Sequence, residues 1–180
     1  GEAGLEEARV YLEDRRETLT DKSGHFKFSY ITPGRQKVYL DLASLPADQT
    51  VRDMVEDVNV KPRRKNYVDF PVIKASSIQG KVFIDSNSDS AYQENEEPLE
   101  SISIIMTPQE QFRRTDQEGD FKFDNLLPGK YQVRINPKDI PLGYELLSGE
   151  KRGVDLAIGK KAKEINFILR LKPTVIIKKF

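Results

Sequence analysis

Apolar and polar residues alternate along much of this chain. Tyr131, Val133 and Ile135 are separated by polar residues, and the same alternation runs through residues 102–106 and 165–171. A period of two sends successive side chains to opposite faces of a β-strand, so one face is buried and the other is solvated. The pattern predicts an all-β protein built from many short strands.

One stretch of sequence occurs twice. Residues 20–28 read Thr-Asp-Lys-Ser-Gly-His-Phe-Lys-Phe, and residues 115–123 read Thr-Asp-Gln-Glu-Gly-Asp-Phe-Lys-Phe, at an offset of 95 residues. Pro33-Gly34 recurs at the same offset as Pro128-Gly129. This period has the size of a domain rather than of a solenoid repeat. We therefore predict two tandem β-sandwich domains, copy one over residues 1–73 and copy two over residues 78–172.

We expect the two ends of the chain to fall within repeats. Residues 2–5 match residues 96–99, so copy one lacks a counterpart of the first strand of copy two. We expect the resulting unpaired edge to be met by another chain, by the tail of a neighbour or by water. Residues 175–180 resemble residues 78–83, so segment 173–180 is interpreted as the first strand of a third copy. An ordinary C-terminal strand is the alternative.

Glycine marks the turn that both copies share. In Asp116-Gln117-Glu118-Gly119 the glycine can adopt a positive φ without steric cost, which suits a hairpin between the flanking strands.

Composition excludes several classes of function. The 180 residues carry 29 basic and 29 acidic side chains, so no basic field attracts nucleic acid or anionic lipid. There is no cysteine for disulfides or thiolate metal sites. No apolar run approaches the roughly 18–20 residues that span a bilayer. We expect no nucleic-acid partner and no membrane insertion by this segment.

The motifs of copy two resemble a known family. They are Gly-Lys-Val-Phe-Ile-Asp at 80–85, Leu-Pro-Gly-Lys-Tyr at 127–131 and Ile-Pro-Leu-Gly-Tyr at 140–144. This combination resembles the B-type repeat domain of serine-aspartate-repeat surface proteins, and the wider group of carboxypeptidase-regulatory-like and collagen-adhesin B-type domains. The resemblance implies a prealbumin-like or immunoglobulin-like β-sandwich. It also implies a stalk that holds an adhesive domain away from a bacterial surface.

One loop carries oxygen donors at the spacing of a calcium loop. In a twelve-residue calcium loop, positions 1, 3, 5, 9 and 12 present side chains and position 7 presents a backbone carbonyl. The residues at these positions here are Asp85, Asn87, Asp89, Gln93 and Glu96, with Ala91 supplying the carbonyl. The sequence therefore predicts a Ca²⁺ site in copy two.

Two departures from the calcium-loop pattern leave an alternative open. Ser90 stands where glycine normally makes the sharp turn, so it must adopt a positive φ or the loop must bend differently. Gln93 is neutral, which leaves three formal negative charges among the ligands. The alternative is a solvated acidic loop without metal.

Other candidate sites are weaker. We predict no catalytic residues and no organic cofactor, and His25 is expected to lie exposed in a turn. The resemblance to collagen adhesins raises a Lys81–Asn166 isopeptide crosslink, which we do not expect because the position for the assisting acid holds Asn136 and Pro137.

The function that these features favour is a non-enzymatic spacer of a bacterial cell-surface or secreted protein, stiffened by calcium. Its partners would be neighbouring repeats of the same chain, and its location extracellular or at the cell surface. The alternatives are an adhesin module that binds a host or matrix protein, and an accessory domain of a secreted hydrolase.

Overall fold

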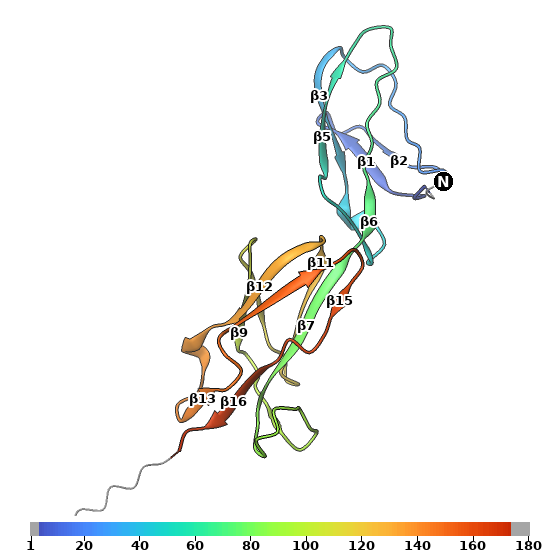
Figure 1. Ribbon diagram of the computed structural model, residues 1–180. Coiled ribbons are helices and arrows are strands. Elements are labelled where there is room, and N and C mark those ends of the chain that lie inside the picture. Colours follow the sequence, from blue (N-terminus) through green and yellow to red (C-terminus); the bar gives the residue numbers. More distant parts are fainter. Residues whose placement is uncertain (1–3, 174–180) are drawn as a thin grey trace, which may run out of the picture. The chain divides into compact units, whose positions relative to one another are not determined.

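A computed structural model describes residues 4–173 and confirms an all-β fold (Figure 1). Contacts divide the chain into two compact units, Gly1–Ala75 (unit 1) and Ser76–Phe180 (unit 2). The division falls between Ala75 and Ser76, inside the short segment 74–77 that separates the two predicted copies. The segment predicted to begin a third copy, 173–180, lies outside the described residues apart from Pro173.

Unit 2 is a sandwich of two sheets. The first sheet is antiparallel and has the order β10-β9-β12-β14. Its strands are β9 (Ser103–Thr107), β10 (Gln111–Arg114), β12 (Gly129–Ile135) and β14 (Lys151–Leu156). Along β12 buried and more exposed residues alternate, as the sequence pattern predicts.

The second sheet of unit 2 is built around the strand that opens it. Its order is β11-β7-β16-β13, with β7 antiparallel to β11 and parallel to β16. Its main strands are β7 (Ser76–Ile84), β11 (Asp120–Leu126), β13 (Tyr144–Leu146) and β16 (Phe167–Leu171). Two short strands, β8 (Glu97–Pro98) and β15 (Lys161–Ala162), also pair with β7.

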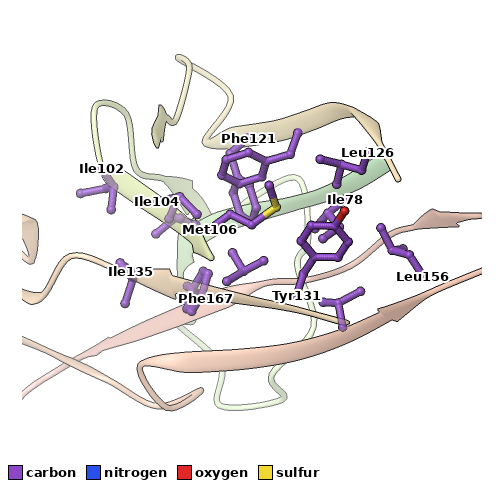
Figure 2. Close-up of a cluster of buried hydrophobic side chains, with 14 of the residues drawn as sticks. Ile78, Ile102, Ile104, Met106, Phe121, Leu126, Tyr131, Ile135, Leu156 and Phe167 are labelled. Atoms are coloured by element: carbon purple, nitrogen blue, oxygen red, sulfur yellow. The ribbon is translucent and has the colours of Figure 1, made fainter. Parts of the chain in front are cut away.

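The core of unit 2 lies between these sheets. Figure 2 shows side chains of both sheets directed into one cluster, among them Ile78, Phe121 and Phe167 from one sheet and Ile104 and Tyr131 from the other. Tyr131 keeps its polar end satisfied because its hydroxyl donates to the Leu127 carbonyl at 2.8 Å. The cluster unites fifteen buried residues.

Unit 1 contains a sheet with the same topology as the first sheet of unit 2. Its order, β2-β1-β3-β5, matches β10-β9-β12-β14 strand for strand. These strands are β1 (Arg9–Leu12), β2 (Glu17–Leu19), β3 (Gly34–Leu40) and β5 (Val55–Val60).

The second sheet is reduced in unit 1. Among the described residues it consists of β4 (Gln49–Val51) and β6 (Val72–Lys74), the counterparts of β13 and β16. Within residues 4–173 each unit also has one single-turn 3₁₀ helix, η1 (Leu42–Ser44) in unit 1 and η2 (Pro137–Asp139) in unit 2. No helix in the described part of the chain is long and apolar enough to cross a membrane.

The shared turn forms as expected, but the predicted hairpin is wrong. Gly119 has φ 73° and donates its N–H to the Asp116 carbonyl at 2.9 Å. In unit 1, Gly24 has φ 75° and donates its N–H to the Asp21 carbonyl at 2.8 Å. The strands on either side of the unit 2 turn, β10 and β11, belong to different sheets. The turn sequence fixes a chain reversal, whereas the partners β9 and β7 decide which sheet each strand joins.

Candidate metal centre

The candidate site is the loop between β7 and β8. These two strands pair antiparallel, with Phe83 opposite Pro98 and Ile84 opposite Glu97. The loop therefore leaves and re-enters the same sheet, and the residues at its two ends, Asp85 and Glu96, are brought together.

Three carboxylates of the loop form a cluster. One oxygen from each of Asp85, Asp89 and Glu96 lies within 4.8 Å of the others. Two oxygens on opposite sides of one calcium ion lie about 4.6–5.2 Å apart, since each is bound at about 2.3–2.6 Å. The cluster thus has the size that a shared calcium ion requires.

Two of the three carboxylates of the cluster are buried, and Asp89 is exposed. Asp85 is 4% exposed and Glu96 is 3% exposed. In the described part of the chain, no ion pair involves either of them or Asp89. Buried carboxylates without a counter-charge are costly, so the donor set fits a bound cation.

Backbone amides hold the two buried carboxylates in place. Asp85 accepts hydrogen bonds from the N–H groups of Ser88 at 2.6 Å and Ser90 at 3.0 Å. Glu96 accepts from the N–H groups of Ser86 at 3.2 Å and Gln93 at 3.1 Å. These bonds compensate part of the cost of burying the two carboxylates and restrict their orientation.

Ser90 resolves the first departure from the calcium-loop pattern. It adopts φ 64°, so a serine occupies the left-handed region at the position where the pattern normally has glycine, and Ser88 also has a positive φ of 68°. The hydrogen bond from Ser90 to Asp85 accompanies this strained backbone.

The uncharged residues of the predicted ligand set, Asn87, Gln93 and Ala91, hydrogen-bond to Asp89 of the cluster. The Asn87 amide nitrogen donates to Asp89 at 3.1 Å and to the Gln93 side-chain oxygen at 2.7 Å, and the Gln93 amide nitrogen also donates to Asp89. Ala91 donates its N–H to Asp89 at 2.8 Å. The structure therefore gathers the carboxylates of Asp85, Asp89 and Glu96 and links the side chains of Asn87 and Gln93 to Asp89. Asn87 and Gln93 present their amide nitrogens to Asp89, and Ala91 presents its N–H rather than the predicted carbonyl.

Hydrogen bonding keeps Asp89 ionised. The bond from the Ala91 N–H, followed by those from the Gln93 and Asn87 side chains, lowers the pKa of Asp89 below its ordinary value. A carboxylate held in its charged form is a suitable cation ligand.

Sequence reasoning missed Tyr92, which attaches the loop to the sheet. Its ring packs edge-on against Phe83 with centroids 5.3 Å apart, and the Lys81 ammonium lies 4.6 Å from its centroid. Lys81 also pairs with Asp120 at 2.9 Å. The available signal was a single aromatic residue in an otherwise polar loop.

Lys81 and Asn166 each make noncovalent contacts with neighbouring strands. The Asn166 side-chain oxygen accepts the backbone N–H of Lys81 at 3.0 Å, which ties the start of β16 to β7. The Lys81 ammonium is engaged with Asp120 and Tyr92. His25 lies in the turn of unit 1 and is exposed, as expected.

Comparison with known proteins gives relatives of one kind. No family model matches the chain. Serine-aspartate repeat-containing protein E of Staphylococcus aureus strain Newman is 24% identical over 155 residues, covering 73% of this chain and 13% of its own length. Serine-aspartate repeat-containing protein D of strain MW2 is 26% identical over 153 residues, covering 73% and 11%. The chain thus spans about an eighth of the length of these relatives.

Solved structures align at low similarity. A minor pilin of Streptococcus agalactiae aligns over 99% of this chain and 88% of its own, with 11% identity and a TM-score of 0.48. A shaft pilin of Lactobacillus rhamnosus GG aligns over 96% of this chain and 87% of its own, with 10% identity and a TM-score of 0.39. The fold assignment rests instead on the strand pairing described above.

None of these relatives is named as an enzyme. The predicted location, extracellular or at the bacterial cell surface, is that of the serine-aspartate repeat proteins. The resemblance that the sequence predicted is therefore confirmed, and the chain is related to the serine-aspartate repeat proteins of Staphylococcus aureus.

Proposed function

We propose that this segment is a non-enzymatic spacer of a bacterial surface protein whose unit 2 is stiffened by calcium. The observation that carries the metal proposal is the pair of buried carboxylates, Asp85 and Glu96, that meet Asp89 within 4.8 Å without a basic partner among the described residues. The proposed ligands are the carboxylates of these three residues, the side-chain oxygens of Asn87 and Gln93, and the Ala91 carbonyl.

The expected effect of the metal follows from the position of the loop. Asp85 and Glu96 lie at the two ends of a loop that joins paired strands, and the Asp85 N–H donates to Leu169 of β16 at 2.8 Å. A cation shared by the three carboxylates would remove their mutual repulsion and hold β8 against β7. Without the cation, repulsion among the carboxylates favours a more mobile loop.

The exposed sheet edges favour a spacer over an adhesin that binds by strand addition. The edge strands of the first sheet of unit 2 are β10, which carries Arg113 and Arg114, and β14, which carries Lys151 and Arg152. Charged side chains on edge strands discourage pairing with foreign strands. The proposed partners are therefore neighbouring repeats of the same chain.

Calorimetric titration of the 180-residue chain with Ca²⁺ at fixed ionic strength tests the metal proposal. We expect a dissociation constant of about 10⁻⁴–10⁻³ M, the range of extracellular calcium modules. Calcium at one to ten times that constant should stabilise unit 2 by about 0.4–1.4 kcal/mol.

Asp85→Asn and Glu96→Gln should abolish the heat of binding and the shift in melting temperature. Glu94→Gln is the matched control, because Glu94 is an exposed acidic residue of the same loop outside the cluster, and it should bind as wild type does. If millimolar calcium produces neither heat nor a melting shift in the wild-type chain, the loop is a solvated acidic loop.

A further inference from the structure

Two apolar residues on the outer face of the second sheet of unit 2 are buried outside the main core. Phe83 of β7 and Ile168 of β16 lie opposite each other in the parallel pair. Their chain neighbours Val82 and Phe167 belong to the core between the sheets, so alternation directs Phe83 and Ile168 to the other face. Phe83 is nevertheless fully buried, and Ile168 is 8% exposed. Another part of the chain therefore shields this face.

The loop that carries the proposed calcium ligands supplies part of this cover. The Tyr92 ring packs edge-on against Phe83, with the ring centroids 5.3 Å apart. Ala91 and Tyr92 of the loop line the same open pocket as Ile168. Burial of apolar surface at this point favours a loop that is folded back on the sheet.

A charged residue of β7 contacts the same ring. The Lys81 ammonium lies 4.6 Å from the centroid of the Tyr92 ring and 2.9 Å from a carboxylate oxygen of Asp120 in β11. The Lys81 side chain is 16% exposed, so water weakens the attraction between ammonium and ring less than it would at an open surface. Tyr92 thus joins the loop to β7 through an apolar contact and a cationic one.

Tyr92 also stands between two backbone groups that bind carboxylates of the cluster. The Ala91 N–H donates to Asp89 at 2.8 Å, and the Gln93 N–H donates to Glu96 at 3.1 Å. Glu96 is held at the end of the loop by the pairing of β8 with β7, whereas Asp89 lies exposed in the middle of the loop. The position of Asp89 relative to Glu96 therefore depends on how the segment around Tyr92 is held.

We propose that Tyr92 is a positioning residue of the carboxylate cluster. By packing against Phe83 and Lys81 it fixes the segment that places Asp89 beside Glu96. The affinity of the loop for calcium then depends on Tyr92, although Tyr92 supplies no ligand; this inference rests on the proposed calcium site. Both contacts are made by the ring, so phenylalanine can replace Tyr92 and alanine cannot.

Backbone amide exchange of the metal-free 180-residue chain tests the positioning without reference to calcium. In Tyr92→Ala the Gln93 N–H should exchange at least about tenfold faster than in wild type, because the segment that holds it opens more often. Tyr92→Phe should retain the wild-type rate. Equal rates in wild type and Tyr92→Ala would overturn the proposal, whether or not the loop binds calcium.

A calcium titration followed by NMR chemical shifts tests the consequence for metal binding. Tyr92→Ala should raise the dissociation constant at least about tenfold, as the loss of residues that orient metal ligands typically does. Tyr92→Phe should bind within about twofold of wild type, because it keeps both ring contacts. If wild type binds calcium and Tyr92→Ala binds it equally well, the proposal is overturned. If wild type binds no calcium, the proposed function fails, and the exchange experiment alone decides the role of Tyr92.

Phe112→Ala is the matched control. It removes an aromatic side chain of the same unit that is 61% exposed and lies on β10 in the other sheet. This variant should change neither the exchange of the Gln93 N–H nor the calcium affinity. An effect equal to that of Tyr92→Ala would mean that both variants act through the stability of the whole unit, which would overturn the proposal.

Exchange of the β12 amides reports whether Tyr92→Ala leaves unit 2 folded. If that variant unfolds the unit, Tyr92→Leu replaces it, because leucine keeps an apolar side chain but makes neither ring contact. Tyr92→Leu should also speed exchange at Gln93 and weaken calcium binding. Wild-type behaviour of Tyr92→Leu in both measurements would overturn the proposal.

Discussion

At the scale of single residues, each unit has a buried threonine at the equivalent position, Thr20 in unit 1 and Thr115 in unit 2. The Thr115 hydroxyl accepts the Ile102 N–H at 2.9 Å and donates to the Leu99 carbonyl at 2.6 Å. Thr20 makes the same pair of bonds, with Ala8 at 2.9 Å and Leu5 at 2.6 Å. In each unit, one threonine hydroxyl therefore hydrogen-bonds a backbone N–H and a backbone carbonyl that are not paired with each other in a β-sheet.

We predict that Thr115→Val destabilises unit 2 by about 1–3 kcal/mol. Valine fills the same volume but leaves a buried N–H and a buried carbonyl without partners. Chemical denaturation of the full chain measures the change. Thr115→Ser should retain most of the stability, and Thr18→Val, at a less buried position, should be nearly neutral. Equal stability of Thr115→Val and wild type would show that the two bonds are dispensable.

A second residue-scale contact differs between the units. In unit 2, Asp139 accepts the Ser103 N–H at 2.8 Å, and in unit 1 the neutral Ser44 hydroxyl accepts the Arg9 N–H at 2.8 Å. Hydrogen bonds from Ser103, its hydroxyl first and its N–H second, lower the pKa of Asp139 below its ordinary value.

This difference predicts an acid sensitivity in unit 2. Because the pKa of Asp139 is lower in the folded state, the unfolded chain binds the proton more readily. The stability that Asp139 contributes is fully present above about pH 4 and is lost as the pH falls through the folded-state pKa. Asp139→Asn should lower the melting temperature of unit 2 at pH 7, and its gap from wild type should shrink towards pH 3. A gap that stays constant with pH would contradict this.

At the scale of elements, similar sequences give different structures in the two units. Residues 120–126 form β11, whereas the equivalent residues 25–31, with the same Phe-Lys-Phe, form no strand. The difference lies in the partner, because β11 pairs with β7 and its counterpart has no such neighbour among the described residues. A strand needs its ladder as well as its alternating pattern.

The packing of β7 leads to a prediction about Gly80. Gly80→Ala should destabilise unit 2 by about 1–3 kcal/mol, because its Cβ would collide with the Ile165 carbonyl and with Phe121. Gly153→Ala in β14 is the matched control; a Cβ there meets nothing within 4 Å, so the change should stay within about 0.5 kcal/mol. Urea unfolding curves of the two variants compare them directly, and equal curves would refute the steric argument.

At the scale of the whole molecule, the two units differ in the size of their cores. Fifteen buried residues form the core of unit 2 and seven form the core of unit 1. Several apolar side chains of unit 1, including Phe26, Phe28 and Phe70, are only partly buried against its core. Because burial of apolar area drives folding, unit 1 should be the less stable unit.

Differential scanning calorimetry of the full chain should therefore show two transitions, with unit 1 unfolding first. Calcium should raise only the second transition, because the carboxylate cluster lies in unit 2. Amide signals from each unit, followed by NMR during heating, would assign the transitions. A calcium shift in the first transition, or earlier melting of unit 2, would contradict this assignment.

The sequence by itself determined the all-β class, the doubled unit and the position of the turns. These follow from local rules: a period of two in polarity, an offset of 95 residues between matching segments, and glycines where φ is positive. It also located the acidic loop, because its donors are close in sequence and follow a fixed spacing.

Only the tertiary structure decided how the strands are distributed between sheets. The turn at Asp116 looked like a hairpin and joins two sheets instead, since β10 and β11 pair with strands from elsewhere in the sequence. The burial of Asp85 and Glu96 and the packing of Tyr92 on Phe83 also depend on β7 and its neighbours. Such pairings join residues far apart in the chain, and local pattern carries no information about them.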